Sequence, residues 1–342
     1  MRNPPHVPLL EERTLAEGIA VSVHDTAPVW RGDTAGDALR RSVDLAQAVE
    51  ALGYRRHWVA EHHDTPALAT SSPAVLAGSI LAATSTIRVG SGAVLLPNHS
   101  PYVVAEQFGV LAGLHPGRVD LGLGRATGGS GRAAARMGDP RGLDFPSALR
   151  ELGEYFTGGS GGVRAIPEPA TPPEIWLVGS SASSAAAAGR LGLPYVYAHA
   201  IVGAGAPEAL EAYRRTFRPS AALPGPYAGV AVIAVAADSD ERAHRLATSF
   251  VYGQILMRTV DPATLLPTEE ETAAHRFTPE EERFLRDRIG PQFVGSPERI
   301  APRLGDLLRV TRADELFVLT QVPDHQARIR SYELVAKIVS SL

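Results

Sequence analysis

Short apolar runs alternate along the chain with longer segments in which apolar residues recur at helical spacing. Apolar runs that end in glycine or polar residues are typical of strands buried on both faces. They predict strands over residues 19–23, 54–60, 87–96, 118–123, 175–178, 195–198, 230–235 and 315–319. The segments between and after them predict helices over residues 37–52, 71–83, 102–114, 146–156, 181–191, 207–217, 240–250, 297–310 and 324–338.

Strands that alternate with helices in this way form parallel βαβ units. The pattern contains eight strand–helix pairs, and eight is the number that closes a (β/α)₈ TIM barrel. We therefore predict an α/β protein with a (β/α)₈ TIM barrel in a single domain over residues 1–342. Residues 1–17 are expected to form a loose N-terminal arm. Residues 253–294 are polar, rich in glutamate and without a clear strand, which predicts an inserted helical and loop excursion.

The composition limits the cellular locations and the binding partners that can be expected. The net charge of −4 argues against general binding to nucleic acid or to a membrane surface. The sequence shows neither a basic and apolar leader nor an apolar run long enough to span a membrane. It contains no cysteine, which excludes disulfides, thiolate metal sites and a cysteine nucleophile. We expect a cytoplasmic enzyme that acts on a small molecule.

Polar residues follow the second, third and fourth predicted strands. The loops after the strands of a parallel barrel open on one side, so the sequence predicts one pocket that gathers Glu61, His62, His63, Asn98, His99 and Arg125. The adjacent histidines leave three interpretations open: a zinc site with Glu61 and His99, a pair that satisfies local backbone groups, or an active-site imidazole that moves a proton. The spacing typical of zinc sites is absent, and we expect no metal.

The ends of the fourth and fifth predicted strands suggest a phosphate site. Arg125 ends the glycine-rich run 122–125 and suits bidentate contact with phosphate, although it could be a surface arginine after a tight turn. Gly179, Ser180 and Ser181 open a helix, where free N–H groups and the positive dipole end bind anions. An ordinary serine cap would look the same. Together the two segments favour a mononucleotide or another phosphorylated cofactor.

The third predicted strand ends in small residues, among them Gly92 and Ala93. Small residues there leave room for a flat ring, but they also suit a strand end that needs slim side chains for packing. The sequence leaves both interpretations open. The glycine-rich stretch after Arg125 predicts a flexible lid, with Thr127 to Gly142 as the candidate closing loop.

Several segments resemble the bacterial luciferase-like flavin monooxygenases. The matching strings are WVAEHH (58–63), RVGSGAVLLPNHSPYVVAEQF (88–108), HPGRVDLGLGR (115–125), WLVGSS (176–181), VGSPE (294–298) and ADELFV (313–318). The resemblance extends over roughly residues 19–338. It implies a barrel that binds reduced FMN and that forms a homodimer through barrel helices.

The resemblance also implies roles for single residues. His62 corresponds to the active-site histidine, with Glu61 beside it. The implied clamp for the flavin phosphate consists of Arg125, Gly179, Ser180 and Ser181. Gly92 and Ala93 correspond to the position where the family often has a non-proline cis peptide under the flavin ring, and His199 corresponds to a residue that contacts flavin or substrate. Gly124 stands where some luciferases have a cysteine, so light emission with an aldehyde is not implied.

The implied reaction is that of a two-component flavin-dependent monooxygenase. A separate flavin reductase would supply FMNH2, which would react with O2 to a C4a-hydroperoxide and oxygenate an organic substrate. His62 would act as a general base or hydrogen-bond donor. Three alternatives stay open: an oxidoreductase of the same fold that transfers hydride with F420, a non-catalytic flavin-binding protein, and a metal-dependent hydrolase.

Overall fold

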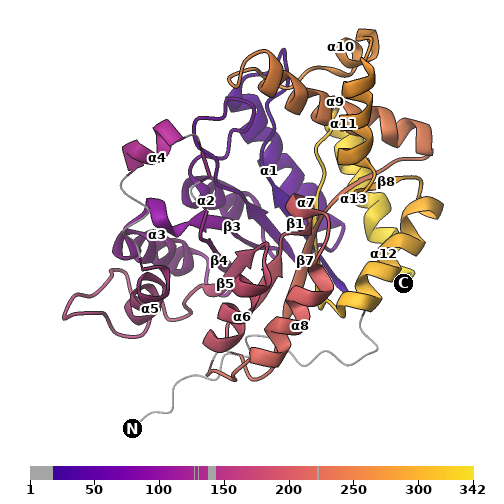
Figure 1. The fold of residues 1–342 in the computed structure, drawn as a ribbon. Coiled ribbons are helices and arrows are strands. Elements are labelled where there is room, and N and C mark those ends of the chain that lie inside the picture. Colours follow the sequence, from indigo (N-terminus) through magenta and orange to yellow (C-terminus); the bar gives the residue numbers. More distant parts are fainter. Residues whose placement is uncertain (1–17, 127, 130, 138–143, 222) are drawn as a thin grey trace.

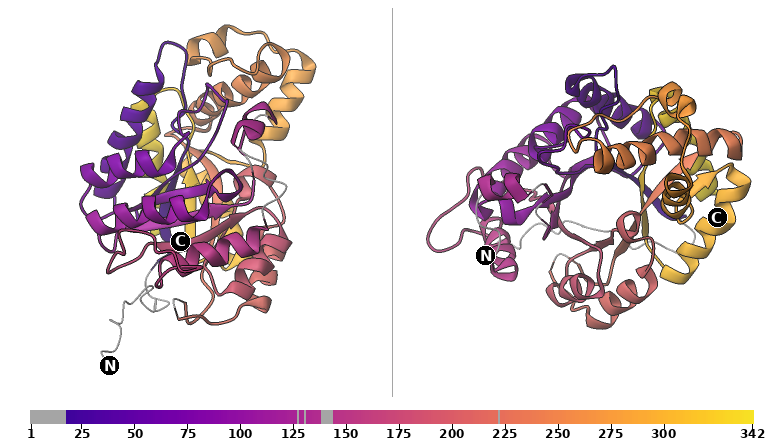
Figure 2. Two further views of the ribbon diagram at one scale, coloured as in Figure 1. Left: turned by 90° about the vertical axis from the view of Figure 1, so that its left-hand side faces the viewer. Right: turned by 45° about the horizontal axis from the view of Figure 1, so that its top comes forward.

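The computed structural model describes residues 18–126, 128–129, 131–137, 144–221 and 223–342. The predicted N-terminal arm and part of the predicted closing loop lie outside these residues. Within them, eight parallel strands form a closed ring surrounded by helices, which confirms the predicted (β/α)₈ barrel (Figure 1). The right-hand view of Figure 2 shows this ring from its open end. No helix of the described segments is long and apolar enough to cross a membrane.

Neighbouring barrel strands pair in parallel, and the last strand closes the ring. The barrel strands are β1 (Ala20–Asp25), β2 (Arg56–Val59), β3 (Arg88–Leu95), β4 (Val119–Gly124), β5 (Glu174–Gly179), β6 (Tyr195–Tyr197), β7 (Ala228–Ala236) and β9 (Glu315–Leu319). Strand β9 pairs with both β7 and β1, which completes the barrel. A further short strand, β8 (Phe293–Gly295), pairs with the last residues of β7.

The predicted helices are present, with ends shifted by a few residues in most of them. They are α1 (Ala35–Ala51), α2 (Pro73–Ala83), α3 (Pro101–Leu114), α5 (Phe145–Tyr155), α6 (Ala182–Leu191), α8 (Ala206–Thr216), α9 (Asp240–Thr259), α12 (Pro297–Thr311) and α13 (His325–Ser340). Two short helices, α4 (Gly131–Met137) and α7 (His199–Val202), were not predicted. Each is too short to show a helical period in its apolar residues.

The segment after β7 differs from the prediction in two respects. Helix α9 continues through Gly253, where the excursion was expected to begin. A Cβ atom on Gly253 would lie 2.5 Å from Leu266 Cδ2, so this helical glycine allows close packing. The helices α10 (Glu269–Ala274) and α11 (Pro279–Ile289) follow, each with a threonine capping box. The segment then ends in β8, a strand that the sequence analysis missed because three residues are too few to reveal a strand period.

A layer of buried charge fills the barrel at the amino ends of its strands. The fully buried Arg56 guanidinium lies 2.8 Å from Asp120, 2.7 Å from Glu174 and 3.1 Å from Glu315. Burial by itself would lower the pKa of Arg56, but the three carboxylates outweigh it and raise the pKa well above its usual value. Because each carboxylate comes from a different strand, this layer joins β2, β4, β5 and β9 across the interior.

Aromatic side chains form the next layer toward the carboxyl ends of the strands. The Trp58 ring centroid lies 5.1 Å from that of Trp176 and 4.4 Å from that of Phe317. The Trp58 indole nitrogen donates to Asp120 and the Trp176 indole nitrogen donates to Glu174, which links this layer to the charged one below it. All three rings are buried, and they close the lower half of the barrel.

Candidate active site

A cavity of about 670 Å³ opens above the aromatic layer, at the carboxyl ends of the strands. Every second residue of each barrel strand points inward, and inward residues line the cavity. Its wall includes Ala60 directly after β2, Gly92 on β3, Gly124 on β4 and Ala231 on β7, and these small residues leave the space open. Of the residues that the sequence analysis placed at the site, eight line this cavity: Glu61, His62, Gly92, Ala93, Arg125, Gly179, Ser180 and Ser181. The predicted residues His63, Asn98, His99 and His199 are not among those that line it.

His62 is an uncharged imidazole at neutral pH. Burial, together with the neighbouring His24, lowers the pKa of His62 from 6.5 to about 4. Its backbone nitrogen donates to the Thr70 carbonyl at 2.7 Å, and its Nδ1 lies 3.4 Å from the Thr70 hydroxyl. These contacts hold the ring at the cavity wall. A neutral imidazole in this place can accept or donate a hydrogen bond and can take up a proton transiently.

Glu61 contacts His63 and His99 by hydrogen bonds, and the ring of His62 is not among its hydrogen-bond partners. Its Oε1 accepts from His63 Nε2 at 2.7 Å and from His99 Nε2 at 2.8 Å, and its Oε2 accepts from the Leu95 backbone nitrogen at 3.0 Å. Burial alone would raise the pKa of Glu61, but these hydrogen bonds outweigh it and lower the pKa. The carboxylate therefore holds the loops after β2 and β3 together at the cavity mouth.

The zinc interpretation of this cluster receives no support from the geometry. Among the residues that the structure describes, no group of three histidine, cysteine, aspartate or glutamate side chains could hold a metal ion. Glu61 binds His63 and His99 by hydrogen bonds, while the ring of His62 contacts Thr70.

The peptide bond between Gly92 and Ala93 is cis, as the resemblance implied. Gly92 is also required by packing, because a Cβ atom on it would lie 3.0 Å from Trp58 Cε3 and 3.3 Å from His24 Cδ2. The interpretation of this strand end as one that needs slim side chains is therefore correct for Gly92. The same slimness opens the cavity, so the two interpretations left open by the sequence are compatible.

His24 is a cavity residue that the sequence analysis did not select. It is the inward residue at the end of β1, and its Nε2 donates to the Gly92 carbonyl. Burial lowers the pKa of His24, so a second neutral imidazole lies beside the first. A signal was available in the sequence, because the alternation of β1 places Ser22 and His24 on the same face.

Arg125 and the start of α6 form the rim of the cavity on the side of β4 and β5. The two strands pair side by side, which brings Arg125 close to the segment 179–181. Arg125 is exposed, and it has no hydrogen-bond or ion-pair partner within the described part of the chain. The Ser181 hydroxyl accepts from the Ser184 backbone nitrogen at 3.2 Å, so the ordinary helix-cap interpretation is correct for this hydroxyl. Ser180 is exposed at the rim.

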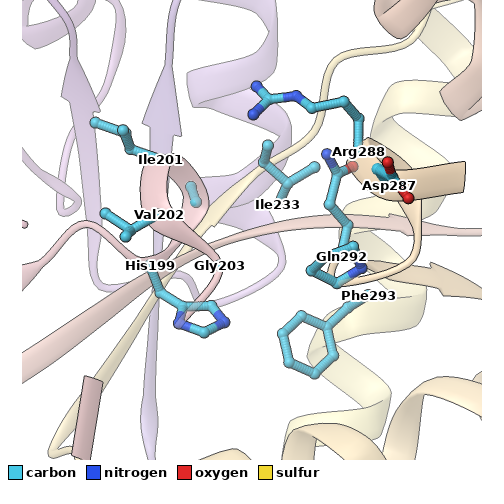
Figure 3. A pocket seen from close by; sticks show the side chains of 11 residues that line it. His199, Ile201, Val202, Gly203, Ile233, Asp287, Arg288, Gln292 and Phe293 are labelled. Carbon is cyan, nitrogen blue, oxygen red and sulfur yellow. The ribbon is translucent and has the colours of Figure 1, made fainter. Parts of the chain in front are cut away.

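His199 lies apart from the other predicted residues. It lines a recess of about 80 Å³ beside the cavity, together with Gln292 and Phe293 (Figure 3). Its neighbours Ala198 and Ala200 do line the main cavity. Burial lowers the pKa of His199, and within the described residues its buried Nδ1 has no hydrogen-bond partner.

Residues from α9 and α11 complete the mouth of the cavity. Phe250, Gln254 and Arg288 line it, and Arg288 Nε donates to Gln254 Oε1 at 3.3 Å. These residues come from a stretch whose sequence has no strand-end position or motif. The sequence analysis therefore could not place them over the barrel.

Comparison with known proteins assigns this fold and site to a family. The family of luciferase-like monooxygenases matches residues 19–315, and the chain belongs to it. The uncharacterized protein YvbT of Bacillus subtilis is 43% identical over 93% of this chain and 96% of its own length. A luciferase-like monooxygenase of Escherichia coli K12 is 39% identical over 95% of this chain and 98% of its own. The chain is accordingly an enzyme of the monooxygenase class, as the sequence predicted.

Solved structures agree with this assignment. The crystal structure of apo-MsnO8 is 37% identical in sequence, with a TM-score of 0.87 over 94% of this chain and 98% of that one. More distant structures share the fold alone. The oxygenating constituent of a Pseudomonas putida diketocamphane monooxygenase, solved with FMN, has 18% identity and a TM-score of 0.70 over 95% and 99%. An F420-dependent secondary alcohol dehydrogenase has 15% identity and a TM-score of 0.66 over 94% and 99%.

We expect the lowered pKa of the partly buried His62 to make the protein less stable in mild acid. In the unfolded chain this imidazole takes up a proton near pH 6.5, whereas in the folded protein it stays neutral down to about pH 4. The unfolded state binds more protons between these values, so the free energy of unfolding falls as the pH is lowered. For this one group the loss reaches about 3 kcal/mol. Urea unfolding near pH 7 and near pH 4.5 measures it.

The variant His62→Gln should show a smaller loss of stability over the same pH range, with the remaining slope due to other groups such as His24. His244→Gln is the matched control, because His244 is exposed on α9, and it should keep the slope of the wild type. A His62→Gln slope equal to that of the wild type would contradict the prediction.

Proposed function

We propose that this enzyme is a two-component monooxygenase that receives reduced FMN from a separate flavin reductase and uses O2 to oxygenate a small organic molecule. The observation that carries the proposal is the set of residues that line one cavity. The neutral His62 and the slim pair Gly92 and Ala93 line its wall, and Arg125 and the start of α6 form its rim.

The residues at the rim fit the phosphate of FMN. Arg125 offers a guanidinium with no partner in the described part of the chain, and a guanidinium can bind phosphate through two parallel hydrogen bonds. The first turn of α6 adds backbone N–H groups and the positive end of the helix dipole. Gly179 allows the end of β5 to lie close to the first turn of α6, since a Cβ atom on this residue would lie 2.4 Å from Ser184 Oγ.

The wall of the cavity fits a flat ring next to the two imidazoles. Gly92, Gly124 and Ala231 keep the space open, and Trp58 and Phe317 form an apolar floor that keeps water out from below. Reduced FMN, when bound, supplies the electrons with which one atom of O2 enters the substrate and the other leaves as water. His62 Nε2 would hold or move a proton beside the ring, because its imidazole is neutral and its Nδ1 lies near Thr70.

We expect His62→Ala to slow the oxidation of protein-bound FMNH2 by O2 by about 10²–10⁴-fold, the usual contribution of one general acid–base group. Stopped-flow flavin absorbance together with O2 uptake measures the rate, and circular dichroism checks that the variant is folded. His244→Ala, an exposed histidine outside the cavity, should behave like the wild type.

An unchanged rate in His62→Ala would show that the histidine is structural. Hydride transfer with reduced F420 and without O2 uptake would favour the deazaflavin alternative, since a barrel of the same fold uses that cofactor. Tight FMN binding with no effect on flavin oxidation would favour a non-catalytic flavin-binding protein.

Arg125→Ala should weaken the binding of FMN by about 1.5–3 kcal/mol, the value of one lost hydrogen bond to a charged group. Fluorescence titration of FMN under reducing and oxidising conditions measures the affinity. Arg190→Ala, at the other end of α6 and also exposed, is the matched control and should bind FMN as the wild type does. Equal affinities in the two variants would remove Arg125 from the proposed clamp.

We further propose that the protein forms a homodimer through α2 and α3. Helix α2 carries no charged residue, and α3 carries Glu106 alone. Their outer faces expose Val75 and Leu114 at 69% each and Val103 and Val110 at 45% each. The left-hand view of Figure 2 shows the helices of this face in front. A helix that is apolar all round is usually buried, so a second copy of the chain is the simplest cover for this surface.

Light scattering should give a mass of twice the 36.2 kDa chain. Val110→Glu would place a charge in the proposed interface and should shift the mass toward that of one chain. Val310→Glu is the matched control, because Val310 is exposed to 47% on α12, away from α2 and α3. A wild-type mass of one chain, or equal masses for both variants, would contradict the dimer.

A further inference from the structure

The geometry points to a substrate that carries a carboxylate, with Arg288 as the residue that binds it. This inference rests on the proposed function, because it concerns the part of the cavity that the cofactor would leave free. Arg288 of α11 lines both the main cavity and the recess beside His199. Ala200, Ile201 and Ile233 also line both, so the recess adjoins the cavity at Arg288.

Arg288 is a partly buried cation without a countercharge. Apart from the hydrogen bond to Gln254, it has no partner among the described residues, and none of their carboxylates lies within 4 Å of it. Asp287 also lines the recess, but Figure 3 shows its carboxylate directed away from the guanidinium. A cation partly removed from water is unfavourable until it is paired. An anionic group in the cavity would supply the missing charge.

Buried arginines elsewhere in the described part of the protein are paired with carboxylates, unlike the two arginines of the cavity. The buried Arg56 contacts three carboxylates, and the buried Arg328 lies 2.6 Å from Asp25. In the described structure, the cavity arginines Arg125 and Arg288 contact no carboxylate. Unpaired arginines in a cavity are expected where ligands supply the anions.

One phosphate group could not neutralise both cavity arginines. Arg125 follows β4, whereas Arg288 lines the recess together with Ile233 of β7. Strands β5 and β6 separate β4 from β7 in the ring, which amounts to roughly 14 Å along the barrel wall at the usual strand spacing. With the phosphate at Arg125, Arg288 is left for a different anion.

The shape of this region suits a carboxylate on an apolar body. The recess of about 80 Å³ is several times larger than one water molecule requires. Figure 3 shows the Gln292 side chain extending toward Arg288. A carboxylate bound by Arg288 could therefore accept a second hydrogen bond from the Gln292 amide. The wall of the main cavity includes the apolar side chains of Phe250, Ile233 and Leu319, which would pack against the apolar part of the molecule.

The test compares two probes of equal chain length, octanoate and 1-octanol, by calorimetric titration of the FMN-loaded protein. Octanoate should bind the wild type about tenfold or more tightly than octanol. In Arg288→Gln the octanoate affinity should fall to that of octanol, while octanol binds as before. Arg288→Lys should keep part of the preference. Arg283→Gln is the matched control, because Arg283 is exposed on the same helix and should keep all of it.

Equal affinities of the wild type for the two probes, or no binding of octanoate, would overturn the inference. A loss of FMN affinity in Arg288→Gln would also overturn it, because Arg288 would then belong to the cofactor site. FMN binding by the wild type is measured first. If the wild type binds no FMN, the proposed function fails, whereas normal FMN binding without a preference for octanoate contradicts this inference alone.

Discussion

The guanidinium of Arg56 lies inside the barrel and joins strands that are distant in the sequence. It contacts Asp120 on β4, Glu174 on β5 and Glu315 on β9. Charges removed from water are tolerated when they are closely paired, so these strands have to meet around Arg56. The ring itself closes where β9 pairs with β1 and β7, and the contacts of Arg56 hold four of its strands together at the lower end. The closed ring in turn determines which strand ends face one another at the upper end, where the cavity lies.

The interior changes character from one end of the barrel to the other. Strand β2 and the residue after it illustrate this, because the inward positions carry Arg56, then Trp58 and then Ala60. The charged layer and the aromatic rings fill the lower half. Higher up, Gly92 and Gly124 replace large side chains and leave the interior open. A cavity above an apolar floor favours chemistry that has to be kept from water, which agrees with a monooxygenase.

Some charged groups around the cavity are paired within the protein, and others have no ion-pair partner among the described residues. Glu61 is fully engaged by His63, His99 and a backbone nitrogen, so its part in the site is to position the loops after β2 and β3. The imidazole of His62 is neutral and lies at the wall. Arg125 and Arg288 lie at separate places on the rim, and the proposals above assign a phosphate to the first and a substrate carboxylate to the second.

The sequence by itself determined the eight barrel strands, most of the helices and the side of the barrel that holds the site. These features follow from local periods of apolar residues and from the rule that parallel strands end on one side. The tertiary structure alone decided that Glu61 binds His63 and His99, that His199 lies in a side recess, and that Arg288 reaches the cavity from α11. Such contacts depend on strand register and helix packing between residues far apart in the chain, and no local period records them.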